Sequence, residues 1–109
     1  MPLHVKVNLQ TTLVNEETNP DFFNGDDDKG LTLEAMQKMV GGYIQQIRLA
    51  KPVVVGDIRY VVLICNEEGK LSGLPFNAIA TRIAKLDNSI MIGDVIVGDA
   101  ILLTAQEAG

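Results

Sequence analysis

Residues 60–75, YVVLICNEEGKLSGLP, decide the fold of this chain. The stretch begins with five consecutive apolar residues at 61–65, continues through the polar segment 66–70 and closes on residues 71–75. An uninterrupted apolar run bounded by turn residues is typical of a strand that is covered on both faces. We therefore predict a buried central strand that leads into a tight polar turn, with Pro75 at the start of a following helix.

Length and composition limit what this chain can be. With 109 residues it has the size of a single domain, and 47% hydrophobic residues are enough for a packed core. Aromatic residues make up only 5% and tryptophan is absent, so we expect an aliphatic core with few surfaces on which bases could stack. The 14 acidic and 9 basic residues give a net charge of −5, which argues against direct nucleic-acid binding and favours a partner with a basic surface.

Targeting and redox signals favour the cytoplasm. The first residues lack the charged start and apolar stretch of a secretory leader, and no apolar run approaches the ~20 residues of a membrane span. Cys65 is the single cysteine, so it has no partner for an internal disulfide, and a reducing compartment is the natural setting. We therefore expect a cytoplasmic protein that makes no contact with a membrane.

Hydrophobic periodicity predicts several short strands and two helices. Residues 3–14 alternate apolar and polar side chains, which is typical of one half-buried strand with a bulge near residues 11–12. Thr32 is a typical N-cap, and Gly41 and Gly42 end the helix predicted over residues 32–41. A second helix is predicted over residues 76–86. Further strands are expected over residues 43–49, 53–55, 58–65 and 90–103. Lys51 and Pro52 separate the strand at 43–49 from the strand at 53–55. Residues 90–103 are expected to form either a pair of short strands or one bulged strand.

These elements define the expected fold class, an α+β fold in one small domain over residues 1–109. Strands joined by short turns pair antiparallel, so we expect a mostly antiparallel sheet of about four to six short strands with the two helices packed on it. Residues 15–30 are predicted to form an acidic loop insertion and residues 104–109 a loose tail.

The insertion over residues 15–30, NEETNPDFFNGDDDKG, contains the candidate contact residues Phe22 and Phe23. One phenylalanine could fix the loop to the core, or the pair could form an exposed anchor for a partner protein. The acidic run Asp26, Asp27 and Asp28 lacks the alternating ligand spacing of a calcium-binding EF-hand loop, so a solvated acidic turn is the better interpretation.

A motif of three apolar residues followed by Gly-Asp occurs three times and ends at Asp57, Asp94 and Asp99. Glycine supplies a positive φ angle and aspartate bonds its own backbone, so repeated use of one kind of turn explains the motif better than a duplicated unit. Three converging aspartates could hold Mg²⁺, but their spacing does not require them to converge.

The titratable residues do not form a recognisable catalytic set. His4, the single histidine, falls on the polar side of the first predicted strand, and Cys65 ends an apolar run, which predicts a buried and unreactive thiol. Glu67 and Glu68 are adjacent on a turn and point in different directions, which favours a solvated turn over an acid–base pair. We therefore expect no enzymatic activity, no cofactor and no bound metal.

Three segments together resemble the DUF3846 domain family. They are residues 33–45, LEAMQKMVGGYIQ, residues 63–77, LICNEEGKLSGLPFN, and residues 94–102, DVIVGDAIL. The most specific pieces are VGGYI at residues 40–44 and CNEEGKL at residues 65–71. The resemblance implies a small domain of unknown function from a bacteriophage, plasmid or other mobile element, inside a bacterial host cell. It assigns no catalytic residue, and the insertion over residues 15–30 departs from the family pattern.

The favoured prediction is a non-enzymatic binding or interaction protein of phage or mobile-element origin that modulates a host protein, as small counter-defence proteins do. Its partner would be a host or phage protein, and the sequence leaves a homo-oligomer open. The alternative is a small-ligand module for a nucleotide, and a less favoured third is a metal-dependent hydrolase that uses the aspartates of the Gly-Asp motifs. The candidate contact residues are Phe22, Phe23, Asp26, Asp27, Asp28, Asn66, Glu67 and Glu68 for a partner protein, and Gly41, Gly42, Tyr43 and Asn66 for a nucleotide.

Overall fold

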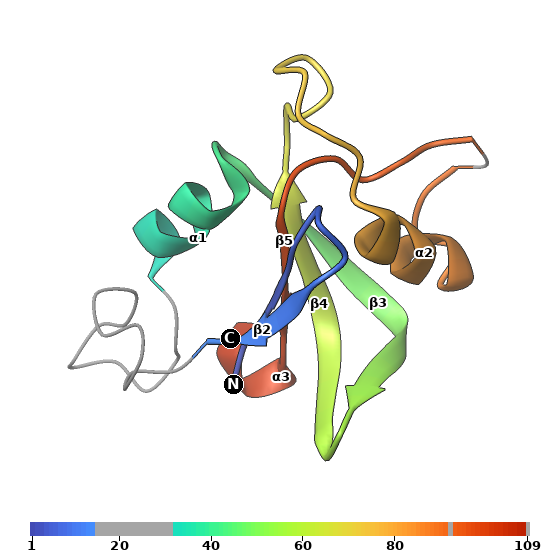
Figure 1. Cartoon of the computed structure of the whole chain (residues 1–109). Coiled ribbons are helices and arrows are strands. Elements are labelled where there is room, and N and C mark those ends of the chain that lie inside the picture. The colour runs from blue at the N-terminus through green and yellow to red at the C-terminus, as the bar shows by residue number, and fades with distance from the viewer. Residues whose placement is uncertain (15–31, 92, 109) are drawn as a thin grey trace.

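The buried strand predicted over residues 58–65 is β4 (Ile58–Asn66), but β4 lies second from the edge of the sheet and not at its centre. The computed structural model describes residues 1–14, 32–91 and 93–108. Its sheet has five strands in the order β2-β1-β5-β4-β3, and every neighbouring pair is antiparallel (Figure 1). The other strands are β1 (Leu3–Val5), β2 (Thr11–Leu13), β3 (Ile44–Val55) and β5 (Ala100–Leu103).

Both faces of the sheet are covered, because β4 is apolar on each side. Leu63 and Cys65 point to one face, where they pack with α2 (Ala78–Leu86). Val62 and Ile64 point to the other face, where they pack with α1 (Leu33–Val40) and the one-turn helix α3 (Ala105–Ala108). Figure 1 shows α1 and α2 on opposite sides of the sheet. The predicted α+β fold with a mostly antiparallel sheet is therefore confirmed.

α1 has the two ends that the sequence predicts. The hydroxyl of Thr32 accepts a hydrogen bond from the amide of Ala35 (3.1 Å). Gly41 ends the helix in the left-handed conformation, with a φ of 83°, and its amide donates to the carbonyl of Gln37. The helix is one residue shorter at each end than the predicted span of residues 32–41.

α2 begins two residues later than predicted. Asn77 is its N-cap, because the side-chain oxygen of Asn77 accepts a hydrogen bond from the amide of Ala80 (3.0 Å). Phe76 therefore lies outside the helix, and it pairs with Val97 in an isolated β-bridge. The start at residue 76 was wrong because Phe76 continues the apolar period of the helix, although its backbone is extended.

The N-terminal segment is a hairpin and not the single strand predicted over residues 3–14. β1 and β2 pair with each other, and the chain reverses near Leu9, which has a positive φ of 71°. The amide of Lys6 donates to the carbonyl of Gln10 (2.8 Å) and closes the turn. Periodicity missed the reversal because the turn residues continue the apolar–polar alternation of the strand.

β3 runs unbroken through Lys51 and Pro52, where the sequence predicts a break. Its pairing with β4 shifts register around these residues, so the extra residues bulge out of the ladder. β3 is an edge strand in the described part of the sheet, and an edge tolerates proline because the missing N–H faces no neighbouring strand. The carboxylate of Asp87 accepts hydrogen bonds from the bulge amides of Ala50 (3.2 Å) and Lys51 (2.6 Å).

Two predictions for the C-terminal quarter of the chain are wrong. In the described part of residues 90–103, which leaves out residue 92, the only strand is β5, because Gly93 and Gly98 adopt positive φ angles of 86° and 77° and turn the chain twice before it. The tail predicted as loose over residues 104–109 contains α3. Thr104 and Glu107 stabilise that turn through the reciprocal hydrogen bonds of a capping box.

The Gly-Asp motifs are turns, as the sequence predicts. Like Gly93 and Gly98, Gly56 has a positive φ, of 61°. The carboxylate of Asp94 also accepts a hydrogen bond from the adjacent amide of Val95 (2.9 Å), which is the backbone bonding expected of aspartate in a turn.

The acidic insertion, with Phe22, Phe23, Asp26, Asp27 and Asp28, lies outside the described residues. The helices that the structure describes are too short to cross a membrane.

Candidate binding pocket

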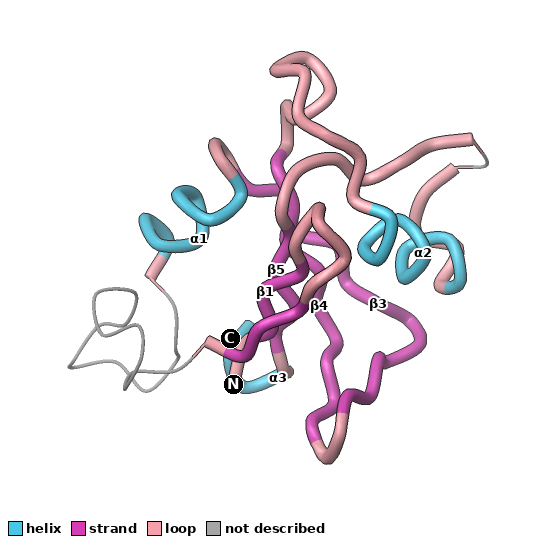
Figure 2. Tube along the Cα trace, viewed as in Figure 1, coloured by secondary structure: helices cyan, strands magenta, loops and turns pink. Residues whose placement is uncertain are grey.

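A pocket of about 330 Å³ lies between the turn that follows β4 and the loop that precedes β5. Figure 2 shows both segments as long loops that project beyond the end of the sheet. We call residues 66–71 the turn wall and residues 90, 91 and 93–97 the loop wall. The lining residues are Gln45 and Ile47 of β3, Cys65 and Asn66 of β4, Glu67, Glu68, Gly69, Lys70 and Leu71 of the turn wall, and Ile90, Asp94, Val95, Ile96 and Val97 of the loop wall.

The turn wall is held in place by Asn66, which is 8% exposed. Its side-chain nitrogen donates to the carbonyl of Val40 at the end of α1 (3.0 Å), and its side-chain oxygen accepts from the amide of Glu68 (2.7 Å). The amide of Glu67 donates to the carbonyl of Tyr43 (2.8 Å). The turn therefore has one conformation fixed by buried hydrogen bonds, which favours a preformed site.

The loop wall is fixed to α2. The amide of Asn77 donates to the carbonyl of Ile96 (2.9 Å), and the hydroxyl of Thr81 both accepts from the amide of Ile96 (2.8 Å) and donates to its carbonyl (3.2 Å). The side-chain nitrogen of Asn77 donates to the carbonyls of Val5 (3.0 Å) and Gly98 (2.9 Å). Both walls are thus anchored in the core, although each is a loop.

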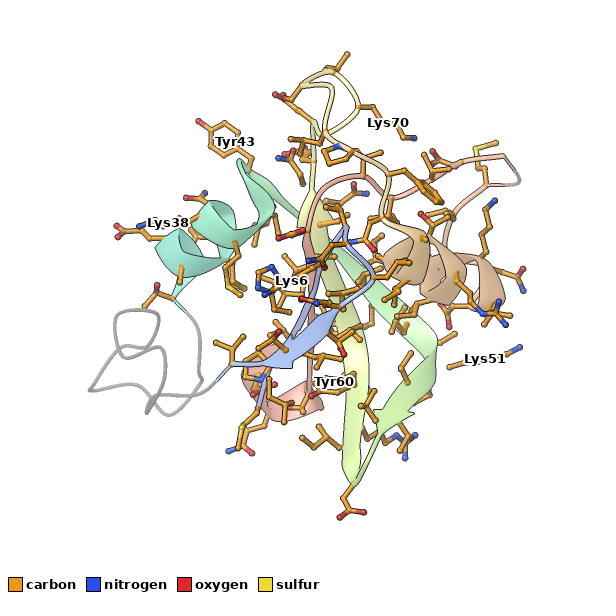
Figure 3. The ribbon with its side chains drawn as sticks, in the orientation of Figure 1. Lys6, Lys38, Tyr43, Lys51, Tyr60 and Lys70 are labelled. Carbon is orange, nitrogen blue, oxygen red and sulfur yellow. The ribbon has the colours of Figure 1, made fainter. Side chains whose placement is uncertain are left out.

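The two walls approach each other closely at two points. Lys70 of the turn wall forms an ion pair with Asp94 of the loop wall, and Figure 3 shows the Lys70 side chain reaching from the turn toward that loop. At the second point Gly69 is required, because a Cβ at this position would lie 2.6 Å from Cγ2 of Val97. The sequence spacing between the two walls gave no signal of either contact.

The floor of the pocket includes the thiol of Cys65. Burial raises the pKa of Cys65 to about 11, and the charge of Lys70 opposes this shift only in part. The thiol is therefore protonated at neutral pH, which agrees with the predicted unreactive cysteine. The thiol donates a weak hydrogen bond to the side-chain oxygen of Gln45, at 4.0 Å.

The structure separates the residues predicted as contacts. Asn66, Glu67 and Glu68 line the pocket. Gly41 and Gly42 lie behind the turn wall, where both amides donate to the carbonyl of Gln37 (2.9 Å each), so neither amide is free to hold a phosphate. Tyr43 is 69% exposed, and Figure 3 shows it on the opposite side of the turn from Lys70.

The aspartates of the Gly-Asp motifs do not share a site. Asp57 lies in the turn between β3 and β4, and Asp94 lies at the pocket. Asp99 accepts from the amide of Val7 (3.0 Å) and lies 2.9 Å from Nε2 of His4, so this histidine has a fixed partner and is not a free surface residue. In residues 1–14, 32–91 and 93–108 no three His, Cys, Asp or Glu side chains are grouped closely enough to hold a metal ion.

The fold and the pocket define a small α+β domain with a preformed recess at one end of its sheet. The family comparison agrees with the resemblance of the three sequence segments. The family model described as "Domain of unknown function (DUF3846)" matches residues 12–109 of the chain. The chain therefore belongs to this family. The match extends beyond residues 33–103 to β2 and α3, and it includes both walls of the pocket. No curated protein and no solved structure matches the chain.

Proposed function

We propose that this chain is a non-enzymatic binding domain that contacts a partner protein at the pocket. The observation that carries the proposal is the pair of side chains beside the pocket. Leu71, which lines the pocket, is 88% exposed, and Met91, which follows the lining residue Ile90 in the chain, is 81% exposed. Large apolar side chains exposed on both walls of a recess are typical of a docking surface, because they bury apolar area only when a partner arrives.

The net charge of −5 supports a partner with a basic surface. A phage, plasmid or other mobile-element origin, action on a host protein and a place in the bacterial cytoplasm remain parts of this proposal. They rest on the expectation from the family resemblance, and they would be tested by identifying the partner.

The nucleotide alternative has less support. The amides of Gly41 and Gly42 already donate to Gln37, and the rim of the pocket carries Glu67 and Glu68, which would repel a phosphate. A metal-dependent hydrolase has less support as well, since Asp57, Asp94 and Asp99 lie at separate places in the structure and do not share a site.

The test is capture of a partner by immobilised protein from a bacterial lysate, with two matched variants. Leu71→Ser with Met91→Ser removes the apolar side chains beside the pocket. Val54→Ser with Leu86→Ser removes side chains of similar exposure, 65% and 64%, that do not line it. We expect the first variant to lose a captured protein that wild type and the second variant retain, with melting temperatures unchanged in both. Capture that is absent in wild type, or equal in both variants, would contradict the proposal.

A further inference from the structure

The floor and the rim of the pocket differ in chemistry. The floor is apolar and uncharged, because the thiol of Cys65 stays protonated at neutral pH. The other apolar lining residues come from β3, the turn wall and the loop wall, and they are Ile47, Leu71, Ile90, Val95, Ile96 and Val97. The uncharged side chain of Gln45 also lines the pocket. The rim carries three carboxylates, Glu67, Glu68 and Asp94, and one ammonium group, Lys70. Three negative charges and one positive charge leave a formal charge of −2.

The negative charge of the rim is not neutralised by the protein itself. Lys70 and Asp94 form an ion pair with each other. Glu67 and Glu68 are exposed, and among the described residues neither forms a salt bridge. Two carboxylates beside an apolar recess favour a guest that is apolar along its length and positively charged at its end.

We infer that the pocket receives a single lysine or arginine side chain from a basic segment of the partner protein, an inference that rests on the proposed function. The aliphatic part of such a side chain would cover the apolar floor, and its charged end would lie at the negatively charged rim. A volume of about 330 Å³ is near the lower end of the ~300–1,000 Å³ typical of ligand pockets, which suits one side chain.

Leu71 and Met91 add a second requirement for the partner. They are exposed beside the pocket, so the residues that flank the cationic side chain would be apolar and would pack on them. The recognised segment therefore has one basic residue between apolar residues. A segment of this kind differs from the purely basic stretch that a diffuse acidic surface would attract.

The probes are four capped pentapeptides, Leu-Gly-X-Gly-Leu, in which X is lysine, arginine, norleucine or glutamate. Binding is measured from the shifts of backbone amide signals of Glu68, Lys70 and Val97 in titrations of the full chain. We expect the lysine or the arginine peptide to bind at least about threefold more tightly than the norleucine peptide, and the glutamate peptide to cause no shift. Equal binding of the norleucine peptide, or no shift with any peptide, would overturn the inference.

The charge on the rim is tested with a matched pair of variants. Glu67→Gln with Glu68→Gln should weaken binding of the cationic peptide by about threefold to tenfold. Glu34→Gln with Asp57→Asn removes the same charge away from the pocket and should leave binding within about twofold, because screening limits the effect of distant charges. Equal weakening by both variants would mean that only the overall charge attracts the peptide, and it would overturn the inference.

The two proposals fail in different ways. If capture depends on Leu71 and Met91 but the peptides show no preference for a cation, the binding function stands and the cationic guest does not. If the cationic peptides bind at the pocket but capture does not depend on Leu71 and Met91, the pocket recognises the side chain and docking occurs at another surface.

Discussion

Asn77 connects three separate parts of the chain through one buried side chain. It caps α2 through the amide of Ala80, and it donates to the carbonyls of Val5 in β1 and Gly98 before β5. Its own amide donates to Ile96 in the loop wall. Because the residue is fully buried, removing its side chain takes a buried hydrogen bond from each of these carbonyls.

We predict that Asn77→Ala lowers the free energy of unfolding by about 3 kcal/mol, the sum of a lost cap and two lost buried hydrogen bonds. Asn77→Ser should keep the cap but not reach Val5 and Gly98, so its loss should be intermediate. Urea denaturation followed by circular dichroism measures both. Gln46→Ala, at an exposed position, is the control and should change stability by less than about 0.5 kcal/mol. A similar value for Asn77→Ala would mean that the buried hydrogen bonds contribute little.

Cys65 gives a prediction in the alkaline range. Burial raises the pKa of its thiol from 9.0 to about 11, so between these values the native state keeps a proton that the unfolded state has lost. Stability must therefore fall as pH rises through this window, by about 1 kcal/mol between pH 9 and pH 10. In Cys65→Ala this part of the decrease should disappear. Burial also raises the pKa of Tyr60 from 10.0, so the comparison is restricted to the range below pH 10. Equal slopes in wild type and variant would contradict the assignment.

At the scale of elements, β3 shows how an edge strand is protected. Its bulge contains Pro52, and Asp87 at the end of α2 satisfies the two bulge amides of Ala50 and Lys51. Such a covered edge cannot pair with a strand of another molecule at this point. The carboxylate therefore links the α2 end to the strand that it packs on.

We predict that Asp87→Ala lowers the free energy of unfolding at neutral pH by about 1–2 kcal/mol. Burial opposes ionisation of Asp87, but hydrogen bonds from Ser89, Lys51 and Ala50 outweigh it and lower the pKa of the carboxyl below 3.8. This stabilisation is present above pH 4 and is lost as pH falls through the lowered native pKa, so the variant should lose less stability than wild type upon acidification. Denaturant titrations from pH 7 to pH 2 measure the difference. Asp57→Asn, in the β3–β4 hairpin, should follow the wild-type profile, and identical profiles for all three proteins would contradict the role of Asp87.

At the scale of the whole molecule, β4 and β5 form the centre of both core clusters. Leu63 and Leu102 pack under α2, whereas Ile64 and Ile101 pack under α1. The cluster under α1 is the smaller of the two, and within α1 only Ala35 and Val40 are buried. Local opening should therefore be easiest at α1 and at the edge strands, and hardest where β4 pairs with β5.

Native-state hydrogen exchange tests this order. The amides of residues 62–64 and 101–103 should exchange only through global unfolding, and their opening free energies should change with denaturant as the global value does. The amides of α1 and β2 should exchange faster, with opening free energies below the global value. Protection of α1 equal to that of β4 would show that the two faces of the sheet open only together.

Much of the structure of residues 60–75 was predictable, because the sequence signals in this stretch act between residues that are close together in the chain. A continuous apolar run predicts a strand covered on both faces, and the capping residues Thr32 and Gly41 predicted the ends of α1 because a cap acts within one helical turn. The segment at residues 65–71, which carries the family resemblance, contains the predicted contact residues Asn66, Glu67 and Glu68, and these three residues line the pocket. The capping box of Thr104 and Glu107 also has a local signature, a threonine followed three residues later by a glutamate, and this signature contradicts a loose tail.

The tertiary structure decided what depends on contacts between distant residues. The alternation over residues 3–14 fits a hairpin as well as a strand, and Pro52 is tolerated only because β3 lies at an edge. Lys70 and Asp94 are 24 residues apart, so no local pattern could pair them across the pocket. The sequence by itself determined the α+β class, the buried strand over residues 58–65 and the acidic turn, but not the position of that strand in the sheet. Only the packing of both loops against α1 and α2 turned that acidic turn into the wall of a pocket, because fixing a loop requires buried hydrogen bonds from elements far away in the chain.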